Sequence, residues 1–374
     1  MEKLNIAVIG CGNIFRCAHL PAYRAMQEVR VVALCDILPE RTQRYAPEFP
    51  DAQCYTDYEQ ILRRADVDAV DICTPNDLHA PIACAALRAG KHVFCEKPDA
   101  ISPELAQQMQ QTAQACGRTL MVMRNNRFVP ASRFARDYIQ SGAAGDIYAA
   151  HCAWQRRRGI PGKGGWFTTK ARSGGGPLID LGVHMIDLAL WLMGNPKPVS
   201  VTGCTYSKFA DNTLADSDNA AFGDAQEAGS YDVEDLAMGF VRLDNGACLT
   251  IEFSWASNVE RERRFVELYG TKAGLKWEDD ALYLFEERND ALVDARPCLP
   301  RVPGNYGHEQ NLRNFADVLL HGAQPCYVPQ QGVDMVRLLC ALYESARTGR
   351  EVRLSRPLRQ KPGPGPLGRG PGPF

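Results

Sequence analysis

The chain has 374 residues, of which 45% are hydrophobic and 23% charged, and its formal net charge is −2. This length is sufficient for two domains with separate cores, and the near-neutral charge gives no reason to expect nucleic-acid binding. No apolar segment is long enough to span a bilayer or to act as a secretion signal, so we expect a cytoplasmic protein without membrane contact.

The first predicted strand, residues 4–9, ends at a glycine turn. The apolar run stops at Gly10-Cys11-Gly12, and a helical pattern follows with Asn13 and Ile14 at its start. A strand, tight turn and helix in this order suit a pyrophosphate, because glycine permits close approach of the backbone and the helix N-terminus favours negative charge. Phe15 stands where a third small residue is usual, so this motif alone is weak evidence.

The second predicted strand, residues 29–35, ends at Asp36. An acidic residue at this spacing binds the adenosine ribose 2′-hydroxyl of a dinucleotide. Its carboxylate would repel a 2′-phosphate, so NAD is favoured over NADP, although Arg41 lies near enough in sequence to leave NADP open.

Two further strands, residues 69–73 and 91–95, flank a predicted helix over residues 78–89. In a doubly wound sheet, ligands bind at the carboxyl ends of the strands. The residues that fall there, and that we predict to meet the cofactor, are Thr74, Pro75, Asn76, Glu96 and Lys97.

The 14 cysteines form no Cys-x-x-Cys pair, and many lie inside apolar runs. They are expected to be small buried hydrophobic residues in a reducing compartment. We therefore predict no metal site.

A helix is predicted from Pro177 to Leu192, after a run of three glycines. Asp180, His184 and Asp187 recur along it at helical spacing, so they are expected to share one face. Such a set is either a buried structural pair, in which His and Asp hydrogen-bond to each other, or part of a catalytic site. A metal site formed by Asp180 and His184 has no further ligand motif to support it.

The second half of the chain is predicted to contain strands at 199–206, 233–243, 247–257 and 262–269, and a helix at 309–320. The acidic, alanine-rich segment 208–230 is predicted to be an inserted mobile loop. The domains expected are 1–124, a dinucleotide-binding domain, and 125–355, a substrate-binding and oligomerisation domain. A Pro/Gly-rich disordered tail, 356–374, is expected to follow.

The motifs together resemble the Gfo/Idh/MocA oxidoreductases over nearly all of residues 1–355. The resemblance rests on Gly10 to Ile14 with His19-Leu20-Pro21, on Thr74 to Asn76 with His79, on Glu96-Lys97-Pro98, and on Gly174 to His184. It implies an α/β fold, with an N-terminal Rossmann domain and a C-terminal α/β domain that has an open, mostly antiparallel sheet. It also implies bound NAD(P), a cofactor contact at His79, a homodimer or homotetramer, and hydride transfer at a sugar or polyol hydroxyl.

The resemblance further implies that Lys97, Asp180 and His184 face the nicotinamide. We assign His184 as general base, Lys97 as the donor to the reacting oxygen, and Asp180 as the group that orients them; which of Lys97 and His184 takes the proton stays open. The residues predicted to shape the substrate site are Arg127, Arg158, Trp166 and Tyr306, together with Asp180 and His184.

The function predicted is NAD-dependent oxidation of a ring hydroxyl of a sugar, glycoside or cyclitol, with C3 of a glucoside as the specific hypothesis. The alternatives are an inositol dehydrogenase, an NAD-retaining enzyme that cleaves glycosides, and a non-catalytic NAD-dependent regulator. The Lys97, Asp180 and His184 set argues against the regulator, because a binding module needs no proton-transfer pair.

Overall fold

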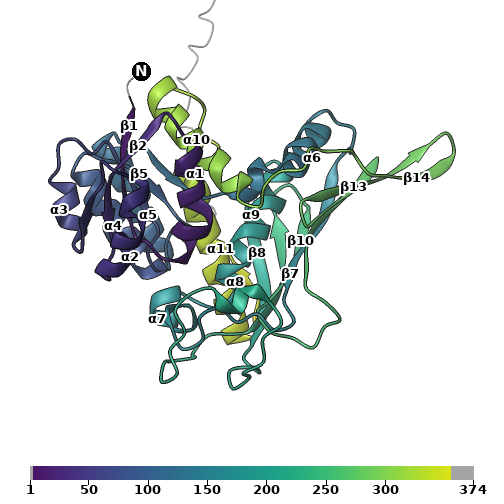
Figure 1. The fold of residues 1–374 in the computed structure, drawn as a ribbon. Coiled ribbons are helices and arrows are strands. Elements are labelled where there is room, and N and C mark those ends of the chain that lie inside the picture. Colours follow the sequence, from purple (N-terminus) through teal and green to yellow (C-terminus); the bar gives the residue numbers. More distant parts are fainter. Residues whose placement is uncertain (1–2, 355–374) are drawn as a thin grey trace, which may run out of the picture.

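A computed structural model describes residues 3–354 of the chain. It has two lobes, one built on each of two sheets (Figure 1). The predicted disordered tail, 356–374, lies outside the described residues.

The N-terminal lobe contains a parallel sheet of six strands in the order β3-β2-β1-β4-β5-β6. Their bounds are β1 (Leu4–Ile9), β2 (Val29–Cys35), β3 (Gln53–Tyr55), β4 (Ala69–Ile72), β5 (His92–Cys95) and β6 (Leu120–Val122). The strand order reverses between β1 and β4, which is the switch point where a doubly wound sheet binds its ligand. The predicted Rossmann fold is confirmed.

Helices cross over between these strands. They are the π-helical turn η1 (Phe15–His19), α1 (Leu20–Ala25), α2 (Pro39–Tyr45), η2 (Ala46–Glu48), α3 (Tyr58–Leu62), η3 (Asn76–Leu78), α4 (His79–Arg88) and α5 (Pro103–Cys116). Phe15 is fully buried, with its ring 5.3 Å from that of Tyr45. The bulky residue at the third motif position therefore packs inside the lobe, beside α2.

The second sheet has nine strands in the order β14-β13-β12-β11-β7-β10-β9-β8-β15. Within residues 3–354, β7 and β10 are the only parallel pair of this sheet, so the predicted open, mostly antiparallel sheet is confirmed. Figure 1 shows β13 and β14 extending as a hairpin away from the two lobes. The bounds are β7 (Ile147–Gln155), β8 (Pro198–Tyr206), β9 (Leu236–Leu243), β10 (Cys248–Ser254), β11 (Arg263–Gly270), β12 (Ala273–Glu278), β13 (Ala281–Arg288), β14 (Ala291–Ala295) and β15 (Val352–Arg353).

The helix predicted over residues 177–192 is interrupted. It forms α8 (Pro177–Asp180) and α9 (Gly182–Leu192), with the break at Leu181. The other elements of this part are η4 (Asn125–Phe128), α6 (Pro130–Gln140), η5 (Trp166–Thr168), α7 (Lys170–Ser173) and η6 (Asp218–Ala221). The segment predicted to be a mobile insertion, 208–230, contains no regular element except η6.

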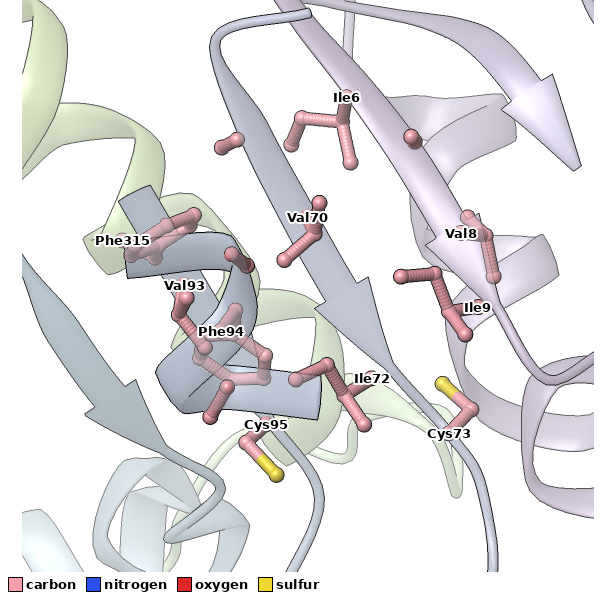
Figure 2. Close-up of a cluster of buried hydrophobic side chains, with 14 of the residues drawn as sticks. Ile6, Val8, Ile9, Val70, Ile72, Cys73, Val93, Phe94, Cys95 and Phe315 are labelled. Atoms are coloured by element: carbon pink, nitrogen blue, oxygen red, sulfur yellow. The ribbon is translucent and has the colours of Figure 1, made fainter. Parts of the chain in front are cut away.

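Two C-terminal helices, α10 (Tyr306–His321) and α11 (Pro329–Thr348), return to the N-terminal lobe. Figure 2 shows Phe315 of α10 in the same cluster as Val93 and Phe94 of β5, and the rings of Phe94 and Phe315 lie 5.3 Å apart. Leu338 and Leu339 of α11 belong to the core of the other lobe. The two helices thus connect the lobes, and residues far beyond 124 contribute to the core of the N-terminal lobe.

Several large apolar side chains on strands of the second sheet are exposed, among them Tyr148, Met238, Tyr269 and Phe285. The homodimer or homotetramer and the cytoplasmic location stay predictions. Within residues 3–354 no single helix combines the length and apolar character of a membrane span, although the bent pair 170–180 and 182–192 passes on length and composition.

Candidate active site

A cavity of about 800 Å³ runs from the carboxyl ends of the parallel strands to the second lobe. Residues from both lobes line it, and most of the predicted site residues are among them. These are Gly10, Gly12, Asn13, Ile14, Asp36, Thr74, Pro75, Asn76, Glu96, Lys97, Trp166, Asp180 and His184.

The glycine turn forms one end of the cavity. Gly10 has φ +98°, and a Cβ at this position would lie 2.6 Å from the carbonyl carbon of Cys73, so only glycine fits. At Gly12 a Cβ would meet only Arg41 Nη1, at 3.8 Å, which leaves open space beside the turn. The Cys11 amide donates to Asp36 Oδ2 at 2.8 Å, so the acidic residue is held beside the turn, where a dinucleotide needs it.

Arg41 is occupied by carboxylates from both lobes. Its Nη2 donates to Asp224 Oδ2 at 2.5 Å, and its Nη1 lies 3.7 Å from Asp36 Oδ2. Asp224 belongs to the segment 208–230 and lines the cavity. The segment predicted as a mobile insertion therefore contacts the cofactor end of the site.

Lys97 and Asp180 meet although they are 83 residues apart in sequence. Lys97 Nζ donates to Asp180 Oδ1 at 2.7 Å, and Trp255 Nε1 donates to Asp180 Oδ2 at 3.0 Å. Burial alone would raise the pKa of Asp180, but Lys97 and Arg156 hold that pKa below its ordinary value. Asp180 is therefore an ionised, oriented carboxylate that fixes the position of the Lys97 ammonium.

The turn before α8 holds Asp180 in place. The buried carboxylate of Glu234 accepts hydrogen bonds from the Gly176 amide at 3.0 Å and the Leu178 amide at 3.1 Å. A Cβ on Gly176 would lie 2.1 Å from the carbonyl oxygen of Glu234. The glycine run thus permits the close approach that caps the helix N-terminus.

His184 lines the same cavity from α9. Its ring lies 6.1 Å from that of Trp154, and neither of its ring nitrogens makes a hydrogen bond within residues 3–354. Burial, and then the charge of Lys97, hold the pKa of His184 well below its ordinary value. The imidazole is therefore neutral at neutral pH and can accept a proton from a bound hydroxyl.

A buried relay supports Lys97 from the N-terminal lobe. The Lys97 amide donates to Glu96 Oε2 at 3.0 Å, and His19 bridges Glu96 and Asp71 at 2.8 and 2.7 Å. Burial would raise the pKa of Glu96, but His19 lowers it to about 2. His19, Asp71 and Cys73 are also close enough to be metal ligands, but both ring nitrogens of His19 already face carboxylates.

His79 and Arg158 do not line the cavity. The ring nitrogens of His79 lie 2.7 Å from the Pro98 carbonyl oxygen and 3.0 Å from that of Thr74, so this buried residue ties together two loops that do line it. Arg158 donates to the Ser257 carbonyl at 2.9 Å and to Asn258 Oδ1 at 2.7 Å. The predicted direct contacts to cofactor and substrate do not fit these positions.

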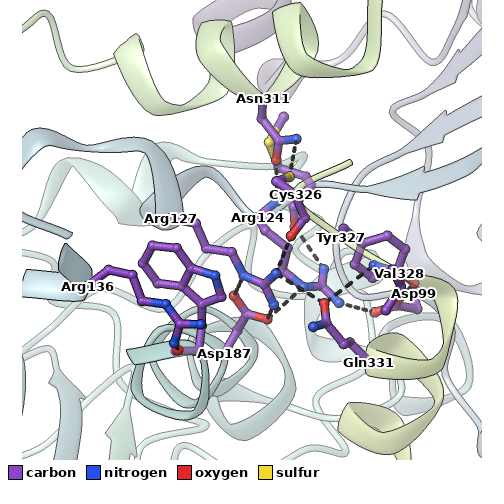
Figure 3. Close-up of polar contacts among 12 residues, drawn as sticks. Asp99, Arg124, Arg127, Arg136, Asp187, Asn311, Cys326, Tyr327, Val328 and Gln331 are labelled. Carbon is purple, nitrogen blue, oxygen red and sulfur yellow. Dashed lines mark hydrogen bonds and ion pairs between the residues drawn. The ribbon is translucent and has the colours of Figure 1, made fainter. Parts of the chain in front are cut away.

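Arg127 lies in a buried ion network between the lobes (Figure 3). Its Nε and Nη2 form a two-point contact with Asp187 at 2.8 and 2.6 Å, and its Nη1 donates to the Cys326 carbonyl and to Gln331. All sides of the guanidinium are occupied, so the predicted substrate role does not fit. Asp187 therefore has a structural role, unlike Asp180 and His184, which line the cavity.

Tyr306 begins α10 and is also absent from the cavity lining, whereas His308, two residues further, is present. Burial lowers the pKa of His308 to about 4. Trp154, Arg156 and Arg264, which lie on or directly after strands of the second sheet, also line the cavity. The stretch 154–170, with its mixture of aromatic and basic side chains, was a sequence-based candidate for shaping the substrate pocket, so Arg264 is the one of these three that the sequence did not indicate.

Two family models match the chain. The oxidoreductase family model with an NAD-binding Rossmann fold matches residues 4–124, and the GFO/IDH/MocA C-terminal domain model matches residues 132–276. The chain belongs to the Gfo/Idh/MocA oxidoreductase family. It is thus an oxidoreductase whose N-terminal domain binds NAD.

Other members of the Gfo/Idh/MocA family are similar over most of the chain. D-glucoside 3-dehydrogenase of Escherichia coli K12 is 32% identical over 360 residues, covering 94% of this chain and 98% of its own length. Levoglucosan dehydrogenase of Pseudarthrobacter phenanthrenivorans is 30% identical over 308 residues, covering 78% and 76%. A solved structure of levoglucosan dehydrogenase with NADH and levoglucosan has a TM-score of 0.81 at 25% identity, covering 95% of this chain and all of that one.

Proposed function

We propose that this protein oxidises the C3 hydroxyl of a glucoside with NAD as hydride acceptor. The observation that carries the proposal is that the Lys97–Asp180 pair and His184 line the same cavity as the dinucleotide turn. His184 is neutral at neutral pH and makes no hydrogen bond within residues 3–354. The similarity to D-glucoside 3-dehydrogenase over 94% of the chain supports the choice of substrate.

Alcohol oxidation requires loss of the hydroxyl proton as hydride leaves the same carbon. NAD supplies the hydride acceptor when bound. His184 accepts the hydroxyl proton at a ring nitrogen, and Lys97 Nζ donates to the reacting oxygen as negative charge develops on it. In reduction of the ketone, the protonated imidazole returns the proton.

Asp180 positions Lys97 in this scheme. It holds the ammonium of Lys97 at 2.7 Å, and Trp255 fixes its second oxygen at 3.0 Å. Since these groups are in place without further rearrangement, the reacting oxygen meets a preorganised donor.

The preference for NAD over NADP follows from the charges at the ribose end. A 2′-phosphate would face Asp36, while the nearby Arg41 is already paired with Asp224 and lies 3.7 Å from Asp36. We expect NAD to bind more tightly by roughly 1–3 kcal/mol. Calorimetry with both dinucleotides measures this difference.

The function is tested by assaying NAD reduction with a panel of glucosides and cyclitols, followed by product analysis. The proposal predicts that methyl β-D-glucopyranoside yields a 3-ketoglucoside with the glycosidic bond intact. Preferential oxidation of an inositol would favour a cyclitol dehydrogenase instead. Release of methanol would favour a glycoside-cleaving enzyme, and bound NAD without turnover on any sugar would favour a regulator.

A further inference from the structure

Arg156 follows β7 and lines the cavity at its second-lobe end. The residue is only 4% exposed, and its guanidinium lies 5.0 Å from the centre of the Trp154 ring. The Ser254 and Ser257 hydroxyls donate to its carbonyl oxygen at 3.3 and 3.2 Å. The backbone that positions this side chain is therefore fixed.

The guanidinium is incompletely paired. Nη1 donates to the Gly159 carbonyl at 3.1 Å, but Nε is buried and has no hydrogen-bond partner among the described residues. The nearest carboxylate oxygen, Glu262 Oε1, is 3.6 Å from Nε and already accepts from Trp154 Nε1 at 2.9 Å. Nη2 also makes no hydrogen bond within residues 3–354 and, unlike Nε, is not fully buried, so it is the donor that a ligand oxygen in the cavity can reach. A hydrogen bond to a ligand oxygen would satisfy this donor.

The cations at this end of the cavity are already balanced. Lys97 pairs with Asp180 at 2.7 Å, Arg264 lies 3.4 Å from Asp279 and 3.2 Å from Asp280, and Arg156 lies 3.6 Å from Glu262. An additional anion would therefore find no surplus positive charge. A neutral ring with hydroxyl oxygens suits this site. Its oxygens can accept from the free donor of Arg156, its face can pack on the Trp154 ring, and it brings no additional charge.

We propose that Arg156 is a substrate-binding residue whose guanidinium donates to a hydroxyl oxygen of a neutral, polyhydroxylated ring. The inference rests on the proposed sugar dehydrogenase function and deepens it, because it names a residue that selects for a neutral sugar ring. Arg156, Lys97 and Asp180 line the same cavity, so a ring bound by Arg156 can reach the Lys97–Asp180 pair.

The test compares Arg156→Gln with the neighbouring Arg157→Gln. Arg157 is the matched control because its side chain is 57% exposed, pairs with Asp216 at 3.3 Å and does not line the cavity. For each variant, KM and kcat are measured with the best neutral sugar substrate, NADH affinity by fluorescence titration, and folding by thermal melting. Arg156→Lys, which keeps the charge but loses the planar fork, replaces Arg156→Gln if that variant does not fold.

We expect Arg156→Gln to raise KM by roughly 10- to 100-fold, the range of a hydrogen bond to a charged donor. NADH affinity and the melting temperature should stay close to wild type, kcat should change less than KM, and Arg157→Gln should behave as wild type. An unchanged KM in a folded Arg156 variant overturns the inference while leaving the proposed function intact. Absence of NAD reduction by wild-type protein on the whole sugar panel would instead refute the proposed function.

Monodeoxy analogues of the same substrate identify the contact. Removal of the hydroxyl that Arg156 binds should raise KM in the wild type and cause no further rise in Arg156→Gln. Equal, additive effects of every deoxy analogue in both proteins would contradict direct binding. A wild-type preference for a uronic acid over its neutral counterpart would contradict the assignment of a neutral ring.

Discussion

At the residue scale, Lys97 and His184 differ in what surrounds them. Lys97 is held by Asp180 and by the Glu96–His19–Asp71 relay, whereas His184 has no hydrogen-bond partner within residues 3–354. A positioned cation and a free imidazole correspond to the two tasks of alcohol oxidation, which are charge stabilisation and proton removal.

Replacement of Lys97 by Met should remove turnover and leave NAD bound. The loss expected is about 10²–10³ in kcat, because a charge-stabilising donor is removed from the reacting oxygen. Turnover and NADH titration on the same preparation measure both effects. Lys197→Met, at an exposed lysine paired with Asp334, is the control, and wild-type turnover in Lys97→Met would assign Lys97 to a purely structural role.

His184→Asn should fold, bind NADH and lose roughly 10²–10⁴ in turnover. Because the pKa of His184 is lowered well below 6.5, the unprotonated base persists as pH falls through 6.5. Wild-type kcat/KM should therefore decline only at pH values below 6.5, and this acid limb should be absent in the variant. A lower melting temperature with normal turnover, relative to a His321→Asn control at the exposed end of α10, would instead indicate a structural histidine.

The strand-end residues could be predicted from sequence because their signal is local. A strand followed by Gly10 or Lys97 places the next residues at the carboxyl edge of a parallel sheet whatever the rest of the chain does. Sequence could not show in this way which arginines line the cavity and which are structural. Arg127 is removed from the site by Asp187, and Arg156 is placed in it by strand pairing; both facts depend on residues distant in sequence.

At the element scale, two loops interlock beside the cavity. The loop 159–165 and the segment 216–229 approach so closely that a Cβ on Gly164 would lie 1.9 Å from the Gln226 carbonyl oxygen, and one on Gly165 would lie 2.2 Å from that of Asp224. Asp224 and Gln226 line the cavity. The glycines near Trp166 are therefore required by packing against a segment that sequence reasoning treated as an independent insertion.

Gly164→Ala should displace the 216–229 segment and weaken NADH binding by roughly tenfold. Gly246→Ala is the matched control, because Gly246 has a similar φ of +89° but nothing within 4 Å of an added Cβ. Both variants incur backbone strain, and only Gly164→Ala should alter NADH affinity in a fluorescence titration. Equal affinities for the two variants would show that the interlocked loops have no part in cofactor binding.

Some strands of the second sheet could be predicted from sequence and others could not. The alternation that predicted 199–206 and 262–269 is clear, and both strands were found. Strands β12 to β14 were missed, and they are stabilised by successive antiparallel pairing with their neighbours. The break at Leu181 was also missed.

At the scale of the whole molecule, the lobes are connected by α10, α11 and the buried Arg124–Asp187–Arg127 network (Figure 3). Sequence patterns predicted two domains but not this return of the C-terminal helices. Hydrophobic periodicity shows that a helix has a buried face, and it does not show which core receives that face.

Arg127→Met should destabilise the folded protein by roughly 3 kcal/mol, because it leaves part of the buried Asp187 carboxylate unpaired. Residual activity per folded molecule should keep the wild-type KM, since Arg127 does not line the cavity. Denaturant unfolding and steady-state kinetics measure the two effects, with Arg133→Met at an exposed position on α6 as control. A raised KM without loss of stability would return Arg127 to the substrate site.

The most direct test of the central claim uses methyl β-D-glucopyranoside with deuterium at C3. If the protein transfers hydride from C3 to NAD, the NADH formed will contain the deuterium, and turnover limited by hydride transfer will slow by a primary isotope effect. Mass spectrometry of the NADH reads the label. NADH formed without deuterium, or no NADH formed from this glucoside, would contradict the account.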